Sequence, residues 1–585
     1  MALKLYLYSL SILLISLVVF IYVRLPVNKL KKYHTNYGKK LINHEGKEIY
    51  DFIIVGAGTA GSILANRLSE KNVSVLLLEV GGVDNDIRVK IPAAFKENFE
   101  TENDWAFNSI PQESKGNHTI FLPSGRILGG SSSINAMIYL RGSAYDYDEW
   151  EKMGFTGWNY ENMLKYFKKS EKQVRNKEMI NEDYHGFNGE WMIGDTSHHP
   201  ISQIIIDSFQ RNWNLSRVND FNEGHYHTEG VGFNQVSIAN GERQSLSEAF
   251  LSGDVLRRPN LYIRTHSLIT KLLIENKKVI GVEVIDLNTN EKTNIYCKKE
   301  VILSAGAYNT PKILQLSGIG DENLLQKHKI PIVLNNPHVG QNLQDHPTIG
   351  LPYSTKEAIT LDHVQKFPYN VIEILKWLWN RDSLLTTNLC EVNGFVRSPT
   401  AKANNETAPD FQIIAGPVIF VDHGRVQFPV PGGYSLGITL LSQKSRGSVN
   451  ISSNNPLDPP VIDTRTFSVK DDFDRLKEMF YLLKSVKDDP RLKEITKDPT
   501  ILDFDTATDE DVKNAINKYS FLLYHHSCTA AMGKVVDQRL KVYEIENLRV
   551  IDASIMPILT RSNTNAPTAA IAEKGADMIK EDYLL

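Results

Sequence analysis

A glycine-rich turn near the N-terminus has the spacing of a dinucleotide-binding site. Gly56-x-Gly58-x-x-Gly61 follows the apolar residues 53–55 and precedes a helical pattern. In that context the first glycine permits a tight turn, the second lets the backbone approach a pyrophosphate, and the third lets helix and strand pack closely. The helix N-terminus would offer free N–H groups to phosphates, and Glu79 would accept hydrogen bonds from ribose hydroxyls. The pattern predicts dinucleotide binding without separating FAD from NAD.

A pair of adjacent histidines, His525 and His526, lies in the segment FLLYHHSCTAAMG near the C-terminus. Histidine is the side chain best suited to remove a proton near neutral pH, because its own pKa lies close to that pH. Adjacent histidines in a loop can also be purely structural. The residues alone therefore leave a catalytic base and a structural loop pair as alternatives.

The three cysteines, Cys297, Cys390 and Cys528, are too few for a disulfide framework and form no CxxC pair. A CxxC pair is the usual basis of a cysteine zinc site or of dithiol exchange. We therefore expect no metal site, and redox chemistry in this chain needs a cofactor.

The composition is that of a globular protein, with 585 residues of which 42% are hydrophobic and 23% charged. At roughly 100–200 residues per domain, this length allows two to four domains. The net charge of -4 provides no basic field for nucleic acid, which is therefore excluded as a partner.

An uncharged run, LYLYSLSILLISLVVFIYV, occupies residues 5–23. It is about long enough to span a bilayer, and no small-residue cleavage site follows it. A signal peptide and a retained membrane anchor both stay open. Arg24, Lys29, Lys31 and Lys32 follow the run, and under the positive-inside rule they favour a cytosolic catalytic domain if the anchor is kept.

The run nevertheless predicts the secretory pathway, with a secreted or membrane-anchored product and membrane association through this segment. Sequons at Asn117, Asn214, Asn405 and Asn450 leave glycosylation open. They carry little weight, because chance would supply about as many in an Asn-rich chain.

The apolar patterns predict a βαβ unit, with strands at residues 53–55 and 76–78 around a helix. Two helices are expected at residues 371–380 and 469–485. Strands are expected at residues 261–285 around a Lys-Lys turn, at 300–304, as short pieces within 434–465, and in LRVIDASIMP before a final helix, APTAAIAEKGADMIK.

Several longer segments resemble the signatures of the glucose-methanol-choline (GMC) flavoprotein oxidoreductases. They are GRILGGSSSINAMIYLRG at residues 125–142, GAYNTPKILQLSGIG at 306–320 and VGQNLQDH at 339–346. DWAFNSIPQ, GWNYENMLKYFKKSE, VIDASIMP and NTNAPT are also similar to the family in order and spacing. The resemblance extends from about residue 48 to 580.

This resemblance implies an α/β chain in which a Rossmann-like FAD-binding domain is interlaced with an α+β substrate-binding domain. We expect a signal or anchor at 1–25, a linker at 26–47, an N-terminal GMC region with part of the substrate domain at 48–346, mainly substrate domain at 347–515, and a C-terminal region completing the FAD domain and active site at 516–585. The implied activity is oxidation of a small-molecule alcohol to an aldehyde or ketone, with oxygen or another electron acceptor.

The resemblance also assigns the cofactor site. Gly129, Gly130 and Ser131 would wrap the flavin and its phosphates. Some family members carry a histidine bonded to the flavin where this chain has Ile134, so we expect noncovalent FAD. The full set of implied cofactor contacts is Gly56, Gly58, Thr59, Ala60, Gly61, Glu79, Trp105, Gly129, Gly130, Ser131, Asn135, Ala136, Met137, Ile269, Asp552, Ala553, Asn565, Pro567 and Thr568.

Aligned to the family's Tyr-His-Pro stretch, His525 becomes the catalytic base. An alcohol gives up a hydride to flavin N5 only if its hydroxyl proton leaves in concert or beforehand, so a base must lie beside N5. His526 replaces the proline and is expected to pack or to meet solvent. The second family position falls on Asn563, whose amide would hold the substrate oxygen.

Two further positions flank the expected flavin site. Pro567 lies in the first turn of the last helix, whose N-terminal dipole would stabilise negative charge at flavin N1 and the C2 carbonyl. Asp552 has two interpretations, a hydrogen bond to the cofactor or a turn cap.

Two alternatives to alcohol oxidation stay open at this level. Some proteins resembling the family keep FAD and the histidine yet cleave cyanohydrins, as a hydroxynitrile lyase does. A catalytically silent binding module could also retain the fold. An anaerobic assay separates the lyase, because a lyase turns over without bleaching the flavin. The alcohol itself is not ranked by the sequence, because most pocket residues are expected between about 350 and 515.

Overall fold

The computed structural model describes residues 29–224, 229–426 and 428–585. The predicted signal or anchor at 1–25 lies outside these residues. Among the residues described, no helix combines the length and apolar character needed to cross a membrane.

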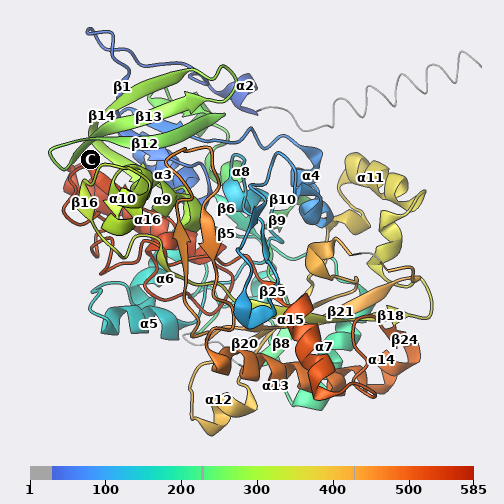
Figure 1. The fold of residues 1–585 in the computed structure, drawn as a ribbon. Coiled ribbons are helices and arrows are strands. Elements are labelled where there is room, and N and C mark those ends of the chain that lie inside the picture. The colour runs from blue at the N-terminus through green and yellow to red at the C-terminus, as the bar shows by residue number, and fades with distance from the viewer. Residues whose placement is uncertain (1–28, 225–228, 427) are drawn as a thin grey trace, which may run out of the picture.

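One sheet has seven strands in the order β11-β2-β1-β14-β13-β12, with β26 added beside β14 (Figure 1). β1, β2, β11 and β26 run parallel to their neighbours, and β12 and β13 form an antiparallel hairpin pair against β14. The strands are β1 (Ile49–Val55), β2 (Val75–Leu78), β11 (Leu261–Arg264), β12 (Ser267–Glu275), β13 (Lys278–Asp286), β14 (Lys292–Leu303) and β26 (Leu548–Val550).

Close packing at the first glycine turn joins this sheet to helix α3 (Thr59–Ser69). Gly56 has a φ of +95°, and a Cβ there would lie 2.5 Å from the Ser304 carbonyl oxygen. A Cβ at Gly61 would lie 1.9 Å from the Gly56 carbonyl oxygen. Only glycine permits both contacts. Helix α16 (Asn565–Asp582) packs against α3 and completes the layer.

A second sheet has eight strands in the order β24-β18-β21-β20-β19-β8-β7, with β25 added beside β18. Helices α7 (Pro200–Trp213), α13 (Lys470–Lys487), α14 (Pro490–Ile495) and α15 (Asp509–Tyr519) pack with it around one apolar core, in the lower part of Figure 1. The strands are β7 (Ser216–Arg217), β8 (Gly230–Phe233), β18 (Pro347–Thr355), β19 (Val392–Val396), β20 (Phe411–Gly416), β21 (Gly433–Leu440), β24 (Thr496–Pro499) and β25 (Phe521–Leu522).

The two sheets draw on interleaved parts of the chain. β7 and β8 come from within residues 48–346 yet belong to the second sheet, whereas β26 and α16 return to the first. The predicted boundary at 346 coincides with the start of β18. The predicted boundary at 515 falls inside α15, which begins at Asp509 and ends at Tyr519.

Most predicted elements are present with small shifts. The helices expected at 371–380 and 469–485 are α11 (Tyr369–Asn380) and α13, and the short strands within 434–465 are β21, β22 (Gly447–Asn450) and β23 (Val461–Asp463). The strand expected at 300–304 is only the end of the longer β14. The strand expected through LRVIDASIMP stops at Val550, because the Asp552 side chain caps a short 3-10 turn, η9 (Ala553–Ile555).

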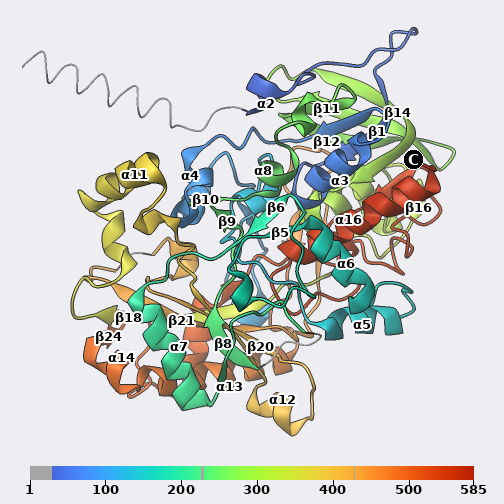
Figure 2. The ribbon, with the colours of Figure 1, turned by 180° about the vertical axis from the view of Figure 1, so that it is seen from behind.

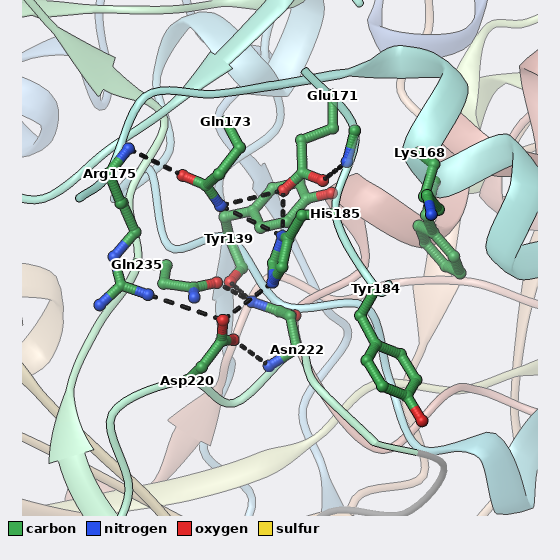
Figure 3. A network of polar contacts seen from close by, with 12 residues as sticks. Tyr139, Lys168, Glu171, Gln173, Arg175, Tyr184, His185, Asp220, Asn222 and Gln235 are labelled. Atoms are coloured by element: carbon green, nitrogen blue, oxygen red, sulfur yellow. Dashed lines mark hydrogen bonds and ion pairs between the residues drawn. The ribbon is translucent and has the colours of Figure 1, made fainter. Parts of the chain in front are cut away.

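A buried network of polar side chains links α6 (Tyr160–Ser170) and β5 (Glu171–Gln173) to the loop before β8 (Figure 3). His185 lies between Glu171 Oε1 at 3.0 Å and Asp220 Oδ2 at 2.8 Å. Arg141 Nη2 donates to Glu171 Oε2 at 2.7 Å. Burial disfavours the charged form of His185, but the two carboxylates outweigh burial and raise the pKa of His185. The network therefore holds these loops through buried ion pairs.

Candidate active site

A cavity of about 320 Å³ lies between the two sheets. Gly56 and Gly58 line it from the glycine turn of the first sheet, and Gly350, Ala415 and Gly437 line it from strands of the second. The predicted site residues that line it are Gly56, Gly58, Thr59, Ala60, Glu79, Trp105, Gly130, Ser131, Asn135, Ala136, Met137, Ile269, His525, Asp552, Ala553, Asn563, Asn565 and Thr568.

Three predicted cofactor residues do not line the cavity: Gly61, Gly129 and Pro567. Gly61 packs against the Gly56 backbone, as described above. Gly129 has a φ of +87°, and a Cβ there would lie 2.3 Å from Ser133 Oγ. Pro567 is buried in the first turn of α16. These residues shape the site through packing and not through direct contact with the cavity.

Two glycine turns meet at the cavity wall. A Cβ added at Gly130 would lie 2.7 Å from the Gly58 Cα, and Gly130 has a φ of +56°. Side chains at this crossing would close the space in which a pyrophosphate approaches the backbone. The cradle therefore fits the phosphates of FAD.

The Glu79 carboxylate lines the cavity at the end of β2 and is buried. Its Oε2 accepts from Ala57 N at 2.9 Å, and its Oε1 accepts from Gly81 N at 2.9 Å. Each oxygen keeps a lone pair for a ribose hydroxyl. Burial, opposed by these N–H groups, raises the pKa of Glu79 to about 7.

Asn135 is fixed by an arginine that the sequence reasoning missed. Arg243 Nη1 donates to Asn135 Oδ1 at 2.7 Å and to the Asn135 carbonyl oxygen at 2.6 Å. Arg243 is 1% exposed, and burial lowers its pKa to about 9. Ile134, beside Asn135, lines the cavity with a hydrocarbon side chain that has no nucleophile to bond a flavin.

Asp552 forms the turn cap, which was one of its two predicted roles. Its Oδ1 accepts from Ser554 N at 2.8 Å, and its Oδ2 accepts from Gly306 N at 2.9 Å and from Thr310 Oγ1 at 2.7 Å. Both carboxylate oxygens therefore already have partners within the protein. The residue joins the end of β26 to the N-terminus of α9 (Gly306–Leu316).

His525 is buried at the cavity wall and is held on both ring nitrogens. Asn563 Nδ2 donates to His525 Nε2 at 3.0 Å, and His525 Nδ1 lies 2.9 Å from His346 Nδ1. Since an amide nitrogen only donates, Nε2 of His525 is the unprotonated nitrogen. Nδ1 of His525 is therefore protonated and donates a hydrogen bond to His346 Nδ1. Gln412 Nε2 donates to Asn563 Oδ1 at 3.2 Å and so keeps the amide in this orientation.

The loops that carry the two rings are tied together by Asp345. Its Oδ1 accepts from the backbone N–H of His346 and of His525, each at 2.8 Å. Burial raises the pKa of Asp345 to about 7. Burial, with a smaller effect of His526, lowers the pKa of His525 to about 3, and burial lowers the pKa of His346 well below its usual value. Both rings are therefore neutral at physiological pH.

His526 also lines the cavity, but its ring stacks on Tyr308 with centroids 4.2 Å apart and an interplanar angle of 16°. Packing was one of the two roles expected for His526, the other being contact with solvent. Burial lowers the pKa of His526 to about 4.

Asp345, His346 and Gln412 were not predicted as site residues, although Asp345 and His346 belong to the family-like segment VGQNLQDH. The only signal for His346 and Asp345 was their position at the end of VGQNLQDH.

The cavity wall beyond His525 is mainly apolar. Phe95, Phe99, Phe420, Phe521 and Tyr524 line it together with Leu389 and Val418. Of the described residues that line the cavity, only Glu79 and Asp552 carry carboxylates, and both bond backbone N–H groups near the glycine turns. This part of the cavity suits an uncharged organic group.

Family profiles match most of the chain. The N-terminal GMC oxidoreductase profile matches residues 50–348, and the C-terminal profile matches residues 443–572. An alcohol dehydrogenase [acceptor] of Pseudomonas putida is 38% identical over 545 residues, covering 91% of this chain and 96% of that protein. The mitochondrial choline dehydrogenase of Mus musculus is 35% identical, covering 92% of this chain and 90% of that protein.

Solved structures of related enzymes have a similar fold. A formate oxidase superposes with a TM-score of 0.85 at 26% identity, covering 92% of this chain and 99% of the other. A fungal aryl-alcohol oxidase superposes with a TM-score of 0.78 at 26% identity, covering 92% and 99%.

Proposed function

The chain belongs to the GMC oxidoreductase family, and we propose that His525 is the base that takes the hydroxyl proton when its alcohol substrate is oxidised. The predicted FAD-dependent alcohol oxidoreductase and the predicted GMC fold are confirmed by these relatives and structures. FAD supplies the hydride acceptor in this chemistry.

The observation that carries the proposal is the neutral, buried His525 with its unprotonated Nε2 beside Asn563. A general base must be unprotonated and within hydrogen-bond reach of the proton that it removes. A substrate hydroxyl entering between the two side chains donates to Nε2, and its oxygen accepts from Asn563 Nδ2. Asn563 then holds the oxygen while negative charge develops on it.

His346 keeps the His525 ring in the useful tautomer. Because His346 Nδ1 accepts the Nδ1 proton of His525, the lone pair of His525 stays on Nε2. When Nε2 takes the substrate proton, His525 becomes a buried cation. Asp345, tied to its backbone N–H at 2.8 Å, is the nearby acid able to balance that charge.

The same proposal includes a noncovalent cofactor. The Gly58 and Gly130 turns approach each other as a phosphate cradle needs, and Glu79 keeps lone pairs for the ribose. Ile134 has no atom able to bond a flavin carbon, so binding rests on these contacts and on packing.

The apolar wall favours an uncharged alcohol with an aliphatic or aromatic group as the substrate. The relatives include both an alcohol dehydrogenase and a choline dehydrogenase. The aromatic rings of this wall also offer cation–π contacts to a quaternary ammonium, so choline is the competing substrate. A panel of 1-butanol, 1-octanol, benzyl alcohol and choline tests this substrate preference. Each alcohol is scored by bleaching of the flavin absorbance without oxygen. Choline as the fastest substrate would overturn it. Repeating the panel in air measures whether oxygen is the acceptor.

The N-terminal run at residues 5–23 supports a location in or beyond the secretory pathway. N-terminal sequencing of native protein distinguishes a cleaved signal from a retained anchor. A protein that starts at Met1 and fractionates with the cytosol would refute both.

A further inference from the structure

The outer face of α11 presents large apolar side chains to the surroundings. Phe367 is 82% exposed and Trp379 is 67% exposed. Together with Tyr369, Val371, Ile372 and Leu375 they form what we call the α11 surface. Both views show α11 projecting from the body of the molecule, at the right in Figure 1 and at the left in Figure 2. Soluble proteins rarely expose a contiguous apolar patch of this kind unless it meets a partner.

The inner face of the helix already provides its attachment to the fold. Trp377 and Leu378 pack with Ile91 in a buried cluster, and Trp377 Nε1 donates to the Gly241 carbonyl oxygen at 2.8 Å. Trp379 and the rest of the α11 surface are therefore not needed to bury the helix.

The charges around the α11 surface have the pattern of an interfacial helix. Lys366 precedes the helix and Lys376 lies within it, and both are exposed. The carboxylate of Glu373 points inward, where it accepts from Leu384 N at 2.9 Å and pairs with Lys376 Nζ at 2.6 Å. An apolar helix face that carries Tyr and Trp, with lysines beside it, is typical of helices that lie in a membrane interface.

The α11 surface lies on the side of the molecule where the N-terminal run begins its connection to the fold. Ile87 of α4 (Ile87–Lys90) packs in the same cluster as Trp377. Lys90 of α4 bonds Glu248 at 2.7 Å, and Glu248 also bonds Lys29 at 3.2 Å. Residues 24–28 separate Lys29 from the uncharged run, and each adds at most roughly 3.5 Å of reach. A bilayer that holds the run is therefore close to this side.

The same elements reach the apolar wall of the cavity. The turns η6 (Leu361–Gln365) and η7 (Leu384–Thr386) flank α11. Leu361 and Leu385 pack in one cluster with Phe95, Leu389 and Val418, all three of which line the cavity.

We propose that the α11 surface docks on a lipid bilayer and places the apolar end of the substrate cavity next to the lipid, so that the enzyme takes alcohols that partition into membranes. The substrate part rests on the proposed function. The docking part rests on the side chains of α11 and on the attachment of the N-terminal run near this side, and it is a contact separate from that run.

A fluorescent label in full-length protein tests the docking. Trp379→Cys and, as a matched control, Leu457→Cys are labelled with an environment-sensitive dye and reconstituted in vesicles of phosphatidylcholine and phosphatidylserine containing doxyl-labelled lipid. Leu457 is also an exposed apolar residue, at 63%, and lies between β22 and β23. Labelling of wild-type protein gives the blank for its native thiols, and the flavin absorbance shows that each variant is folded.

Docking predicts that the dye at position 379 shifts to the blue and is quenched at least fivefold more than the dye at 457. Equal quenching at the two positions would overturn the proposal. A blue shift at 379 without quenching, together with dimerisation that Trp379→Ser abolishes, would assign the surface to a second copy of the chain and also overturn it.

An activity assay is the second test and addresses access of substrate from the lipid. The double variant Phe367→Ser/Trp379→Ser should raise the apparent KM for 1-hexadecanol in vesicles about tenfold, because the apolar side chains that hold the domain to the lipid are gone. Oxidation of soluble 1-butanol should be unchanged. If wild-type protein oxidises neither alcohol, the proposed function fails while the labelling result still stands. If the KM for vesicle-borne hexadecanol is unchanged, lipid-side access is wrong.

Discussion

His525 and His346 face each other through their Nδ1 atoms at 2.9 Å, with ring planes 86° apart and both side chains buried. A histidine base oriented by a second histidine differs in the charge of its partner from a histidine base oriented by a carboxylate. Its partner is another neutral ring, so the pair can hold one tautomer without fixing a charge in the cavity wall. The pair therefore presents the lone pair of His525 Nε2 to an alcohol, and Asp345, which accepts from the His525 backbone N–H, is the acid that balances the proton taken up.

Alanine substitutions of the two adjacent histidines should have different effects on the rate of flavin reduction. His525→Ala should lower the rate of flavin reduction by around 10²–10⁴-fold, the usual contribution of a positioned general base. His526→Ala removes a ring that stacks on Tyr308 and should cost far less. Stopped-flow reduction with one alcohol measures both, and equal rates would mean that the base is misassigned. Flavin occupancy should survive in each.

Asn563→Ala should fall between these two variants. Loss of one hydrogen bond to a developing oxyanion costs around 2.7–4 kcal/mol in a preorganised site, and the same change frees His525 Nε2 from its donor. The single-turnover rate of flavin reduction measures it. A rate equal to that of wild-type protein would remove Asn563 from the mechanism.

His346 should behave as a positioning residue. In His346→Leu the Nδ1 proton of His525 loses its acceptor, and an unpaired buried donor costs about 1–3 kcal/mol, so the reduction rate should drop roughly 10- to 100-fold. His346→Gln offers an oxygen acceptor and should recover most of the rate. KM should stay near that of wild-type protein in both, because His346 does not line the cavity. A merely structural role would give no recovery by glutamine.

The sequence predicted the residues that line the cavity better than the contacts between them. The glycine turn, Glu79 and Asn563 were all predicted, and each lines the cavity. The signal for the glycine turn and Glu79 is local, because both belong to one βαβ unit, whereas Asn563 was assigned only through the family resemblance.

The contact of His346 with His525 depends on long-range pairing and had no such local signal. β18 and β25 pair antiparallel, with Pro347 opposite Leu522, and this register brings the two loops together. Asp552 shows the same limit, because its hydrogen bonds with Gly306 and Thr310, far away in the chain, had no local signal.

The phosphate cradle can be tested with two glycines of similar backbone conformation. Gly130→Ala places a Cβ 2.7 Å from the Gly58 Cα, whereas Gly253, with a φ of +53°, has no atom within 4 Å of an added Cβ. Both changes carry roughly 1–2 kcal/mol of left-handed strain, but only Gly130→Ala should lose FAD. The A280 to A450 ratio of purified protein reports occupancy. Equal occupancy in the two variants would contradict the cradle.

Glu79→Ala should also lower FAD retention. It removes the predicted ribose acceptor and leaves the N–H groups of Ala57 and Gly81 without their present partner. Gly58→Val should act similarly by adding branched bulk at the phosphate turn. Full flavin occupancy in both variants would show that the assigned register of the fingerprint is wrong.

Acid precipitation tests the linkage of the flavin. With Ile134 at the position where some family members carry the bonded histidine, the flavin should pass into the supernatant when the protein is denatured in trichloroacetic acid. A washed pellet that stays yellow would show a covalent bond. Absorbance of the two fractions at 450 nm decides.

The histidines of the cavity wall should make the folded protein sensitive to acid. A histidine with a native pKa of about 4, such as His526, stays neutral while its unfolded counterpart takes up a proton below about pH 6.5. The unfolded state then binds more protons, so stability falls as the pH drops from about 6.5 to 4. At pH 5 the loss is about 2 kcal/mol per histidine. His526→Phe keeps a ring against Tyr308 and should reduce the drop in the free energy of unfolding between pH 7 and 5 by that amount.

His185 should show the opposite sign. Its pKa is raised in the folded state, so its contribution is fully present below about pH 6.5 and is lost as the pH rises through its folded pKa. His185→Gln should therefore destabilise the protein most in acid, whereas His526→Phe protects it there. His44→Phe, at a side chain that is 91% exposed, serves as the control. Thermal unfolding of the flavin-loaded variants at pH 5, 6 and 7 measures all three. Parallel pH profiles for His526→Phe and His185→Gln would contradict the opposite electrostatic environments of the two rings.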